Sequence, residues 1–446
     1  MERSQERDGG EGVAGREPDG AGLRLRREIG LWSAVSLIAG CMIGSGIFMS
    51  PQGVLVYVGS PGASLVVWAV CGLLAMMGAL CYAELGALVP KSGGEYAYIL
   101  QIFGSLPAFL VIYTFVLLVR PAAIAAVSLS FAEYAVAPFY PGCSSMPQAV
   151  LKAVAAICIL LLTLVNCWSS RLATMLMNQA GRIGMAFYQG LWSFDGWNNV
   201  NYVLEELKNP KQNLVWALMI AIPLVTSLYL LVNISYLLVL SPNELLSSDA
   251  MAVSWGNQVL GDWAWLVPLA VTLSTLGSTN GTFFGGSRVC YVAAREGHMP
   301  QLLSMVHVHR LTPTPALMFT AAVALVLVIP GNFSTIVNFL SFLGWITYGT
   351  TISCLLYLRM KKNLPRPYKV PTVIPVIMLL ASLYLVLAPI IDHPQIEFLY
   401  IFLFLLSGIP VYFLLVHFQC QPKWLQMATM YLQLLLEVAP AIKNVD

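Results

Sequence analysis

Long apolar segments recur along almost the whole chain, and they limit the fold more than any other feature of the sequence. A helix needs about 20 apolar residues to cross a bilayer. About eleven stretches approach or exceed that length: 31–58, 66–89, 106–138, 150–168, 183–202, 213–240, 264–290, 315–330, 334–358, 372–391 and 396–418. Because only 10% of the residues are charged, against about 25% in soluble domains, the sequence predicts an all-α polytopic membrane protein.

Polarity divides the chain into three parts. Residues 1–28 form a polar N-terminal tail, residues 29–418 hold the apolar segments, and residues 419–446 form a C-terminal tail. The stretch from Trp424 to Val438 is weakly amphipathic, which is typical of a helix that lies on the membrane surface. A net charge of +2 gives no reason to expect a nucleic-acid partner, and we expect no cleaved signal peptide before the first span.

The positions of Lys and Arg predict the topology, because short basic loops face the cytoplasm. Basic loops alternate with loops that contain no Lys or Arg, and this alternation places both termini in the cytoplasm. It fails once, because the loops 169–182 and 203–212 are both basic and only the segment 183–202 separates them. Either that segment does not cross fully or one span is absent. The abrupt junction at 171–182 favours an absent span.

The first span contains a glycine-serine-glycine interruption at Gly44, Ser45 and Gly46. Glycine weakens a helix interior, and in lipid an unwound backbone is tolerated only beside a protein-lined cavity. Free N–H groups and the positive end of a half-helix would suit a carboxylate, so these residues and Ile43 are candidate binding residues. A close helix–helix contact through Gly40 and Gly44 would explain the same small residues, and this stretch alone does not separate the two interpretations.

The fifth apolar segment is interrupted at Ser193, Phe194, Asp195 and Gly196, next to Trp192. A carboxylate at mid-bilayer is costly and indicates function, although an interfacial aromatic belt with Asp195 near water is the alternative. The unwound segment would offer carbonyl oxygens and Asp195 to an ammonium, and Trp192 would cap a bound side chain. A small molecule that carries both a carboxylate and an ammonium is an amino acid. We therefore expect substrate-binding residues at Trp192, Ser193, Asp195 and Gly196.

One of the nine cysteines, Cys143, lies in a proline- and glycine-containing loop that resists helix formation. The other eight lie in or beside apolar segments, where cysteine is usually a small buried residue. If the loop is extracellular, its lone thiol indicates an intermolecular disulfide.

Six motifs carry a resemblance to a known family: Ile43–Phe48, Tyr82–Gly86, Lys91–Tyr96, Pro138–Cys143, Asp195–Asn198 and Glu205–Pro210. From about residue 25 to 440 the chain resembles the light subunits of heteromeric amino acid transporters, most of all the cystine/dibasic exchanger and an aromatic-preferring member. The resemblance implies an inverted-repeat fold of twelve helices in which helices 1 and 6 are discontinuous. It also implies sodium-independent exchange of amino acids at the plasma membrane, and a disulfide from Cys143 to a single-span glycoprotein heavy chain.

The chain departs from this family at one place. The family's fifth helix, expected between about Gln179 and Gly181, is missing, which agrees with the failed charge alternation. The leading hypothesis is therefore a sodium-independent exchanger of neutral or aromatic amino acids, with dibasic amino acids as a further substrate class. The alternative is a truncated membrane protein that does not transport and has a binding or regulatory role.

Other polar residues allow weaker interpretations. Glu84 is either a charge that reaches the membrane interface or part of a turn into a scaffold segment. Arg120 either pairs with carbonyls freed by Pro121 or lies near the substrate path. His298, His307 and His309 are expected to be solvated loop residues, too few for a metal site. No catalytic group or phosphate-binding loop is present in the sequence, so we expect neither an enzyme nor a cofactor or metal.

Overall fold

The computed structural model describes residues 29–44, 46–58, 60–89, 91–139, 147–168, 194–241, 244–245, 251–329, 333–361, 368–392, 396–418 and 423–440. The N-terminal tail, Ser45, the Cys143 loop and the stretch 169–193 with Trp192 and Ser193 lie outside these residues. Predictions that fall there, including the missing fifth helix, stay predictions.

Helices make up almost all of the described chain. In the first part they are α1 (Leu31–Met42), α2 (Gly46–Val58), α3 (Pro61–Leu88), α4 (Glu95–Phe103), α5 (Ser105–Thr114), η1 (Phe115–Val119), α6 (Arg120–Val136), η2 (Ala137–Phe139) and α7 (Gln148–Trp168). The second part has α9 (Asn199–Tyr202), η4 (Leu204–Glu206), α10 (Pro210–Val239), α12 (Met251–Val259), η5 (Gly261–Trp263), α13 (Leu266–Arg295), η6 (Gln301–Ser304), β1 (Met305–His307), α14 (Thr314–Val328), α15 (Phe333–Lys361), α16 (Val373–Asp392), α17 (Ile396–Tyr412), η7 (Phe413–His417), α18 (Lys423–Leu435) and β2 (Val438–Pro440).

The prediction of an all-α polytopic membrane protein is confirmed. Within the described residues, five stretches are long and apolar enough to cross a bilayer: Leu31–Phe48, Pro61–Leu88, Ser105–Val136, Gln148–Trp168 and Gln212–Val239. The later predicted spans also coincide with helices, of which α13 is the most polar because its inner face carries buried Ser, Thr and Asn side chains. Of the predicted span 183–202, the described part contains only the short helix α9.

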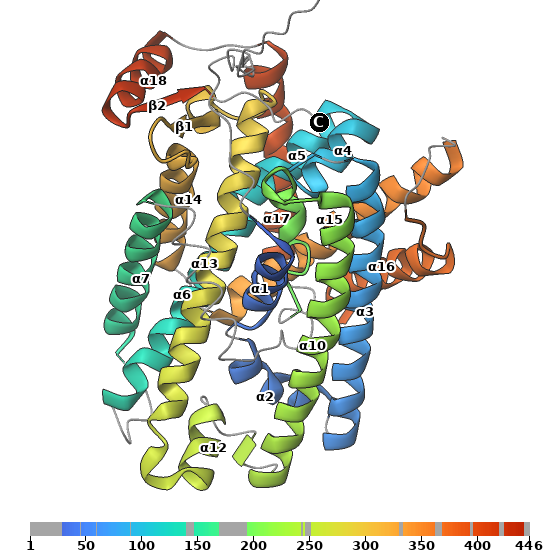
Figure 1. Ribbon diagram of the computed structural model, residues 1–446, viewed down its shortest axis with the longest axis vertical. Coiled ribbons are helices and arrows are strands. Elements are labelled where there is room, and N and C mark those ends of the chain that lie inside the picture. The colour runs from blue at the N-terminus through green and yellow to red at the C-terminus, as the bar shows by residue number, and fades with distance from the viewer. Residues whose placement is uncertain are drawn as a thin grey trace, which may run out of the picture.

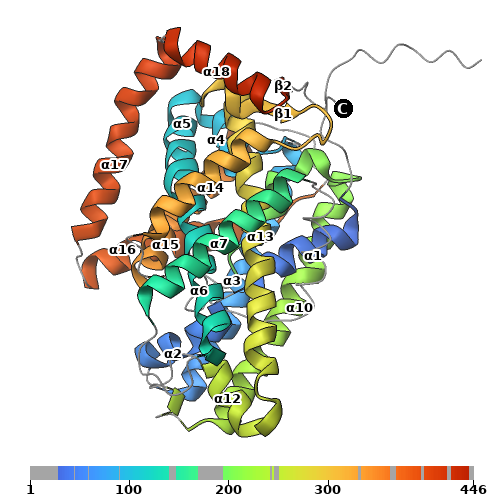
Figure 2. The same ribbon diagram turned by 90° about the vertical axis from the view of Figure 1, so that its left-hand side faces the viewer.

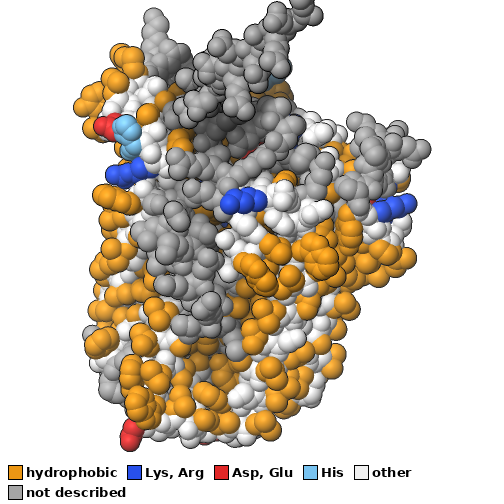
Figure 3. Space-filling view, in the orientation of Figure 1, with side chains coloured by type: hydrophobic (Ala, Val, Ile, Leu, Met, Phe, Trp, Pro, Cys, Tyr) orange, Lys and Arg blue, Asp and Glu red, His pale blue; other side chains and the backbone are white. Residues whose placement is uncertain are grey.

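Helix α1 lies at the centre of the molecule, packed against α10 and α13, while α3 covers α10 and α6 covers α13 (Figure 1). Helices α16 and α17 lie toward one side, as Figure 2 shows. On the face drawn in Figure 3, hydrophobic side chains spread over the flanks, and the Lys and Arg side chains lie toward the end that carries α18. This distribution is the one expected of a helical bundle surrounded by lipid.

The end of the molecule that carries α18 is held together by polar contacts between distant segments. Strand β2 of the C-terminal tail pairs antiparallel with β1 in the loop after α13, with Val306 opposite Ala439. Arg295 pairs with Glu205 at 2.6 Å and Arg288 pairs with Glu206 at 2.9 Å. These contacts place the C-terminal tail and the basic loop after α13 on the same side of the molecule, as the charge pattern predicts.

Glu84 belongs to the same end, and the interface interpretation of this residue is wrong. Its side chain is completely buried, it pairs with Arg359 at the end of α15, and it accepts a hydrogen bond from the Val370 N–H at 2.9 Å. The carboxylate joins α3 to α15 instead of reaching the membrane surface.

Candidate functional site

The first interrupted helix is broken where the sequence predicts. Helix α1 ends at Met42 and α2 begins at Gly46, and Ile43 has non-helical backbone angles of φ −75° and ψ 80°. Gly44 also lies directly against α13, because a Cβ there would be 2.8 Å from the Cβ of Ser278. The break and the close helix contact are therefore both present, and the two interpretations of this stretch do not exclude each other.

Hydroxyl groups from later helices satisfy the carbonyl end of α1. Ser278 Oγ donates to the Cys41 carbonyl at 3.0 Å, Tyr229 Oη to the Met42 carbonyl at 2.8 Å, and Ser274 Oγ to the Ile43 carbonyl at 3.1 Å. The N–H groups in the first turn of α2 have no acceptor within their own helix. The break therefore leaves hydrogen-bond donors and a positive helix end for a ligand, but few free acceptors.

The second interruption touches the first. Residues 194–198 form turns before α9, and Gly196 has a φ of +106°, a conformation that favours glycine. A Cβ at Gly196 would lie 2.7 Å from the Cβ of Cys41 at the end of α1. Asp195 is partly buried and accepts a hydrogen bond from Tyr348 Oη of α15 at 2.7 Å.

Two adjoining cavities lie at the interruptions, and Asp195 and Ala123 line both of them. The smaller, of about 20 Å³, is bordered by Gly44, Gly46 and Gly196, and further by Cys41, Met42, Val127, Asn199, Ser278 and Thr282. The structure thus brings together Gly44, Gly46, Asp195 and Gly196, all of which the sequence singles out. Ile43 is buried beside them without bordering the cavity.

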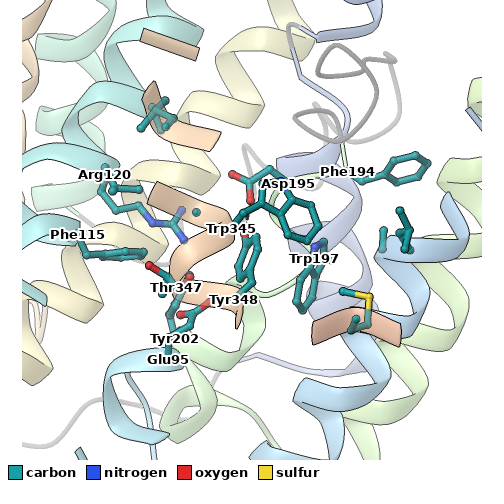
Figure 4. Close-up of a pocket in the computed structure, with 17 residues that line it drawn as sticks. Glu95, Phe115, Arg120, Phe194, Asp195, Trp197, Tyr202, Trp345, Thr347 and Tyr348 are labelled. Carbon is teal, nitrogen blue, oxygen red and sulfur yellow. Dashed lines mark hydrogen bonds between the residues drawn. The ribbon is translucent and has the colours of Figure 1, made fainter. Parts of the chain in front are cut away.

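The larger cavity, of about 70 Å³, has aromatic walls and three charged side chains (Figure 4). The aromatic residues are Phe115, Phe194, Trp197, Tyr202, Trp345 and Tyr348, and the charged ones are Asp195, Glu95 and Arg120. One water molecule needs about 15 Å³ or less of such volume, so the cavity has room for several waters or for part of a side chain.

Sequence reasoning missed Glu95. This residue begins α4, and its Oε1 accepts a hydrogen bond of 2.6 Å from Nδ2 of Asn198. Burial raises the pKa of the Glu95 carboxyl, and the hydrogen bond from Asn198 opposes this change. The preceding Gly94 has a φ of +52°, and a Cβ there would lie 2.5 Å from the Tyr202 ring, so the turn that places Glu95 at the cavity favours glycine.

Arg120 lines the larger cavity. The geometry therefore supports the interpretation that places this residue near the substrate path. The π-helical turn η1 precedes it, and no carbonyl in the described part of the chain accepts a hydrogen bond from its Nε. The alternative, pairing with carbonyls freed by Pro121, has no support in the described residues: Pro121 lies in the first turn of α6, directly after η1, and no hydrogen bond joins Arg120 Nε to a carbonyl there.

His298 is not the solvated residue that the sequence predicts. Its ring is buried, with Nδ1 2.8 Å from Tyr96 Oη of α4 and Nε2 2.7 Å from Ser105 Oγ of α5. His309 is exposed and His307 is partly exposed, as expected of loop residues.

An all-α membrane protein in which the break between α1 and α2 meets the turns before α9 at two cavities has the architecture of a secondary transporter. The amino acid permease family matches residues 29–185 and 173–415. The chain belongs to this family, and it is a transporter and not an enzyme.

Two curated relatives agree with this assignment. The b(0,+)-type amino acid transporter 1 of Homo sapiens is 45% identical over 459 aligned positions, which cover 93% of this chain and 94% of the relative. The large neutral amino acids transporter small subunit 2 of Mus musculus is 41% identical over 446 positions, covering 91% and 84%.

The comparisons also bear on the junction after α7. An alignment of 459 positions is longer than this chain of 446 residues, so the human relative contains residues that have no counterpart here. The family match is in two parts that meet at 173–185, where the sequence predicts the absent fifth helix.

Proposed function

We propose that this chain is a sodium-independent amino acid exchanger whose substrate binds across the two interruptions. The substrate carboxylate is bound by N–H groups at the start of α2, and its ammonium lies at the second interruption beside Asp195. The observation that carries this proposal is the contact of Gly196 with Cys41, which puts the donors of one interruption and the carboxylate of the other at one cavity.

The substrate side chain occupies the larger cavity. Its flat walls, from Trp197, Trp345 and Tyr348, suit large neutral or aromatic side chains. Asp195 would also attract a dibasic side chain, as the resemblance to the cystine/dibasic exchanger implies. Trp192 and Ser193 complete this site in the proposal, with Trp192 as a cap over the bound side chain, and Ser45 adds a hydroxyl at the first interruption.

The same proposal includes a partner and a location. The chain acts at the plasma membrane, with both termini in the cytoplasm, as the light subunit of a heterodimer. Cys143 forms the disulfide to a single-span glycoprotein heavy chain. Support comes from the position of this thiol in the loop immediately before α7, a loop without Lys or Arg.

Counterflow in proteoliposomes tests the exchange. We expect labelled phenylalanine to leave preloaded vesicles only when an amino acid is present outside. Gly46→Val should abolish this efflux at normal protein levels, because a branched side chain blocks the approach of a carboxylate to the α2 N–H groups. Gly62→Val is the matched control, since Gly62 has open space around it and lines neither cavity.

Efflux that does not depend on external substrate would contradict exchange, and normal counterflow by the Gly46→Val protein would remove the carboxylate site from the proposal. The second candidate is a protein that binds amino acids without transporting them. The human relative contains residues that have no counterpart in this chain, and this difference favours the second candidate. Substrate binding without any counterflow would establish that candidate.

A further inference from the structure

Arg120 is a buried cation that has no ion pair in the described part of the chain, although Asp195 and Glu95 lie near enough to attract its charge. Its side chain is only 5% exposed, and its guanidinium carbon lies 4.7 Å from the Phe115 ring centre and 4.6 Å from the Tyr202 ring centre. Within the described part of the chain no carboxylate forms an ion pair with it, and its Nε has no hydrogen-bond acceptor. The centres of the two rings are 5.6 Å apart, so both rings lie toward one side of the guanidinium, whose Nε has no acceptor in the described residues.

A buried charge that lacks hydrogen-bond acceptors is costly, because burial removes the water that solvates the ion. Each aromatic ring offsets part of this cost, which leaves a polar edge that still gains from an acceptor. Figure 4 shows the Arg120 side chain reaching from α6 into the group of residues that line the larger cavity. An acceptor that enters the cavity with a substrate would meet this edge.

The other charges of the cavity limit which acceptor fits. Asp195 and Glu95 line the same space, and each already accepts a hydrogen bond, from Tyr348 and Asn198. A substrate carboxylate placed against Arg120 would be the third carboxylate in one small cavity. A substrate cation would instead lie beside the Arg120 charge. A neutral oxygen acceptor avoids both repulsions.

We propose that Arg120 selects amino acids whose neutral side chain ends in an oxygen acceptor, such as a phenol, an aryl ether or an amide, over apolar side chains of the same shape. This inference rests on the proposed function, since it assigns the larger cavity to the substrate side chain. In this proposal Arg120 determines specificity through the substrate side chain and takes no part in binding the α-amino and carboxylate groups.

Two amino acids of nearly equal shape test the selection. 4-Methoxyphenylalanine has an ether oxygen where 4-ethylphenylalanine has a methylene, so only the first can accept a hydrogen bond from Arg120. Binding is measured as thermal stabilisation of the purified full chain over a range of ligand concentrations, which requires no transport. We expect the methoxy compound to bind about tenfold more tightly, the effect of one hydrogen bond to a charged group.

Arg120→Met keeps a long apolar stem and removes the donors. We expect this variant to bind the two compounds with equal affinity, through weaker binding of the methoxy compound alone, whereas Arg120→Lys should keep part of the preference. Arg310→Met is the matched control, because Arg310 is an exposed cation that stacks on Trp168 away from the cavities. It should leave the preference intact.

Equal binding of the two compounds by the unaltered protein would overturn the inference. It would also be overturned if arginine or glutamate bound more tightly than the methoxy compound, or if neither compound stabilised the protein. If Arg120→Met does not fold, the comparison on the unaltered protein decides alone. Counterflow with phenylalanine is a separate measurement, so a protein that exchanges phenylalanine without this preference keeps its proposed function and loses only the role of Arg120.

Discussion

At the scale of single residues, two glycines allow the two interruptions to meet. Gly44 lets Ser278 approach the break of the first helix, and Gly196 lets the second segment approach Cys41. A methyl group at either position would meet atoms under 3.0 Å away, so the segments would have to separate. The site therefore depends on the absence of two side chains as much as on the groups that bind.

Asp195→Asn tests where the charge of Asp195 acts. Because Asp195 borders the small cavity between the interruptions, we expect it to bind the ammonium that all substrates share. Uptake of phenylalanine and uptake of arginine should both fall, each by about tenfold or more, which is about 1.4 kcal/mol or more. Initial uptake rates at equal surface expression measure this.

Tyr348→Phe is the control for the Asp195 variant, since it removes the hydrogen-bond donor and leaves the carboxylate. We expect it to have the smaller effect. A selective loss of arginine uptake in the Asp195→Asn protein would show instead that Asp195 recognises a dibasic side chain.

How far the sequence predicts the site depends on the type of residue. Gly44, Gly46, Asp195 and Gly196 are recognisable because glycine and a carboxylate are out of place in an apolar span. Glu95 gives no such signal, because it lies in a polar turn where acidic residues are common. It reaches the cavity only through the positive φ angles of the two glycines before it, and no periodicity reveals this.

At the scale of secondary-structure elements, α13 connects the site to the end of the molecule that carries α18. One face of this helix supplies Ser274 and Ser278 to the first interruption, and its last turns supply Arg288 and Arg295 to the ion pairs with Glu206 and Glu205. Just after α13 ends, His298 contacts α4 and α5. His298 is therefore in direct contact with α4, the helix that carries Glu95.

The burial of His298 predicts a pH effect on stability. Burial lowers the pKa of its imidazole, so the neutral ring is favoured in the folded protein. The pKa of His298 is lower in the folded state than in the unfolded state, where it is about 6.5. The neutral ring therefore stabilises the fold above about pH 6.5, and this stabilisation is lost as the pH falls through the folded-state pKa. We expect the midpoint temperature of thermal unfolding to decrease as the pH is lowered from about 7.5 to about 5.5.

His298→Gln separates this group from the others that titrate in the same range. An amide can donate to one hydroxyl and accept from the other, as the neutral ring does, but it does not titrate. The variant should show a smaller fall of the midpoint, whereas His309→Gln, at an exposed position, should behave like the unaltered protein. An unchanged pH dependence in His298→Gln would contradict a role for this ring.

At the scale of the whole molecule, the hydrophobic pattern predicts the helices well because length and polarity decide whether a segment crosses lipid. The pattern does not predict which helices pack together, since lipid and protein interior are equally apolar environments. Helix α3, for example, lies along α10, more than a hundred residues later in the chain. Only the polar residues on buried faces, such as those of α13, indicate which face turns inward.

The proposed heterodimer gives the fifth prediction. Non-reducing gels of native membranes should show this chain in a high-mass band that collapses on reduction, and Cys143→Ser should lose the band. Cys167→Ser is the control, since Cys167 is a free, partly buried thiol of α7 and should leave the band in place. A band that persists in the Cys143→Ser protein would assign the link to another cysteine.

The hydroxyl groups that cap α1 have a consequence for how the chain is made. The carbonyls of Cys41, Met42 and Ile43 are satisfied by residues that follow them by 237, 187 and 231 positions. When α1 first leaves the ribosome, these partners do not yet exist, and a bare carbonyl in lipid costs several kcal/mol. The interrupted conformation of the first span is therefore stable only after α10 and α13 have been synthesised and inserted. Until then the nascent span is more stable when it is fully helical or close to the water interface, so the candidate site forms only after α10 and α13 are in place.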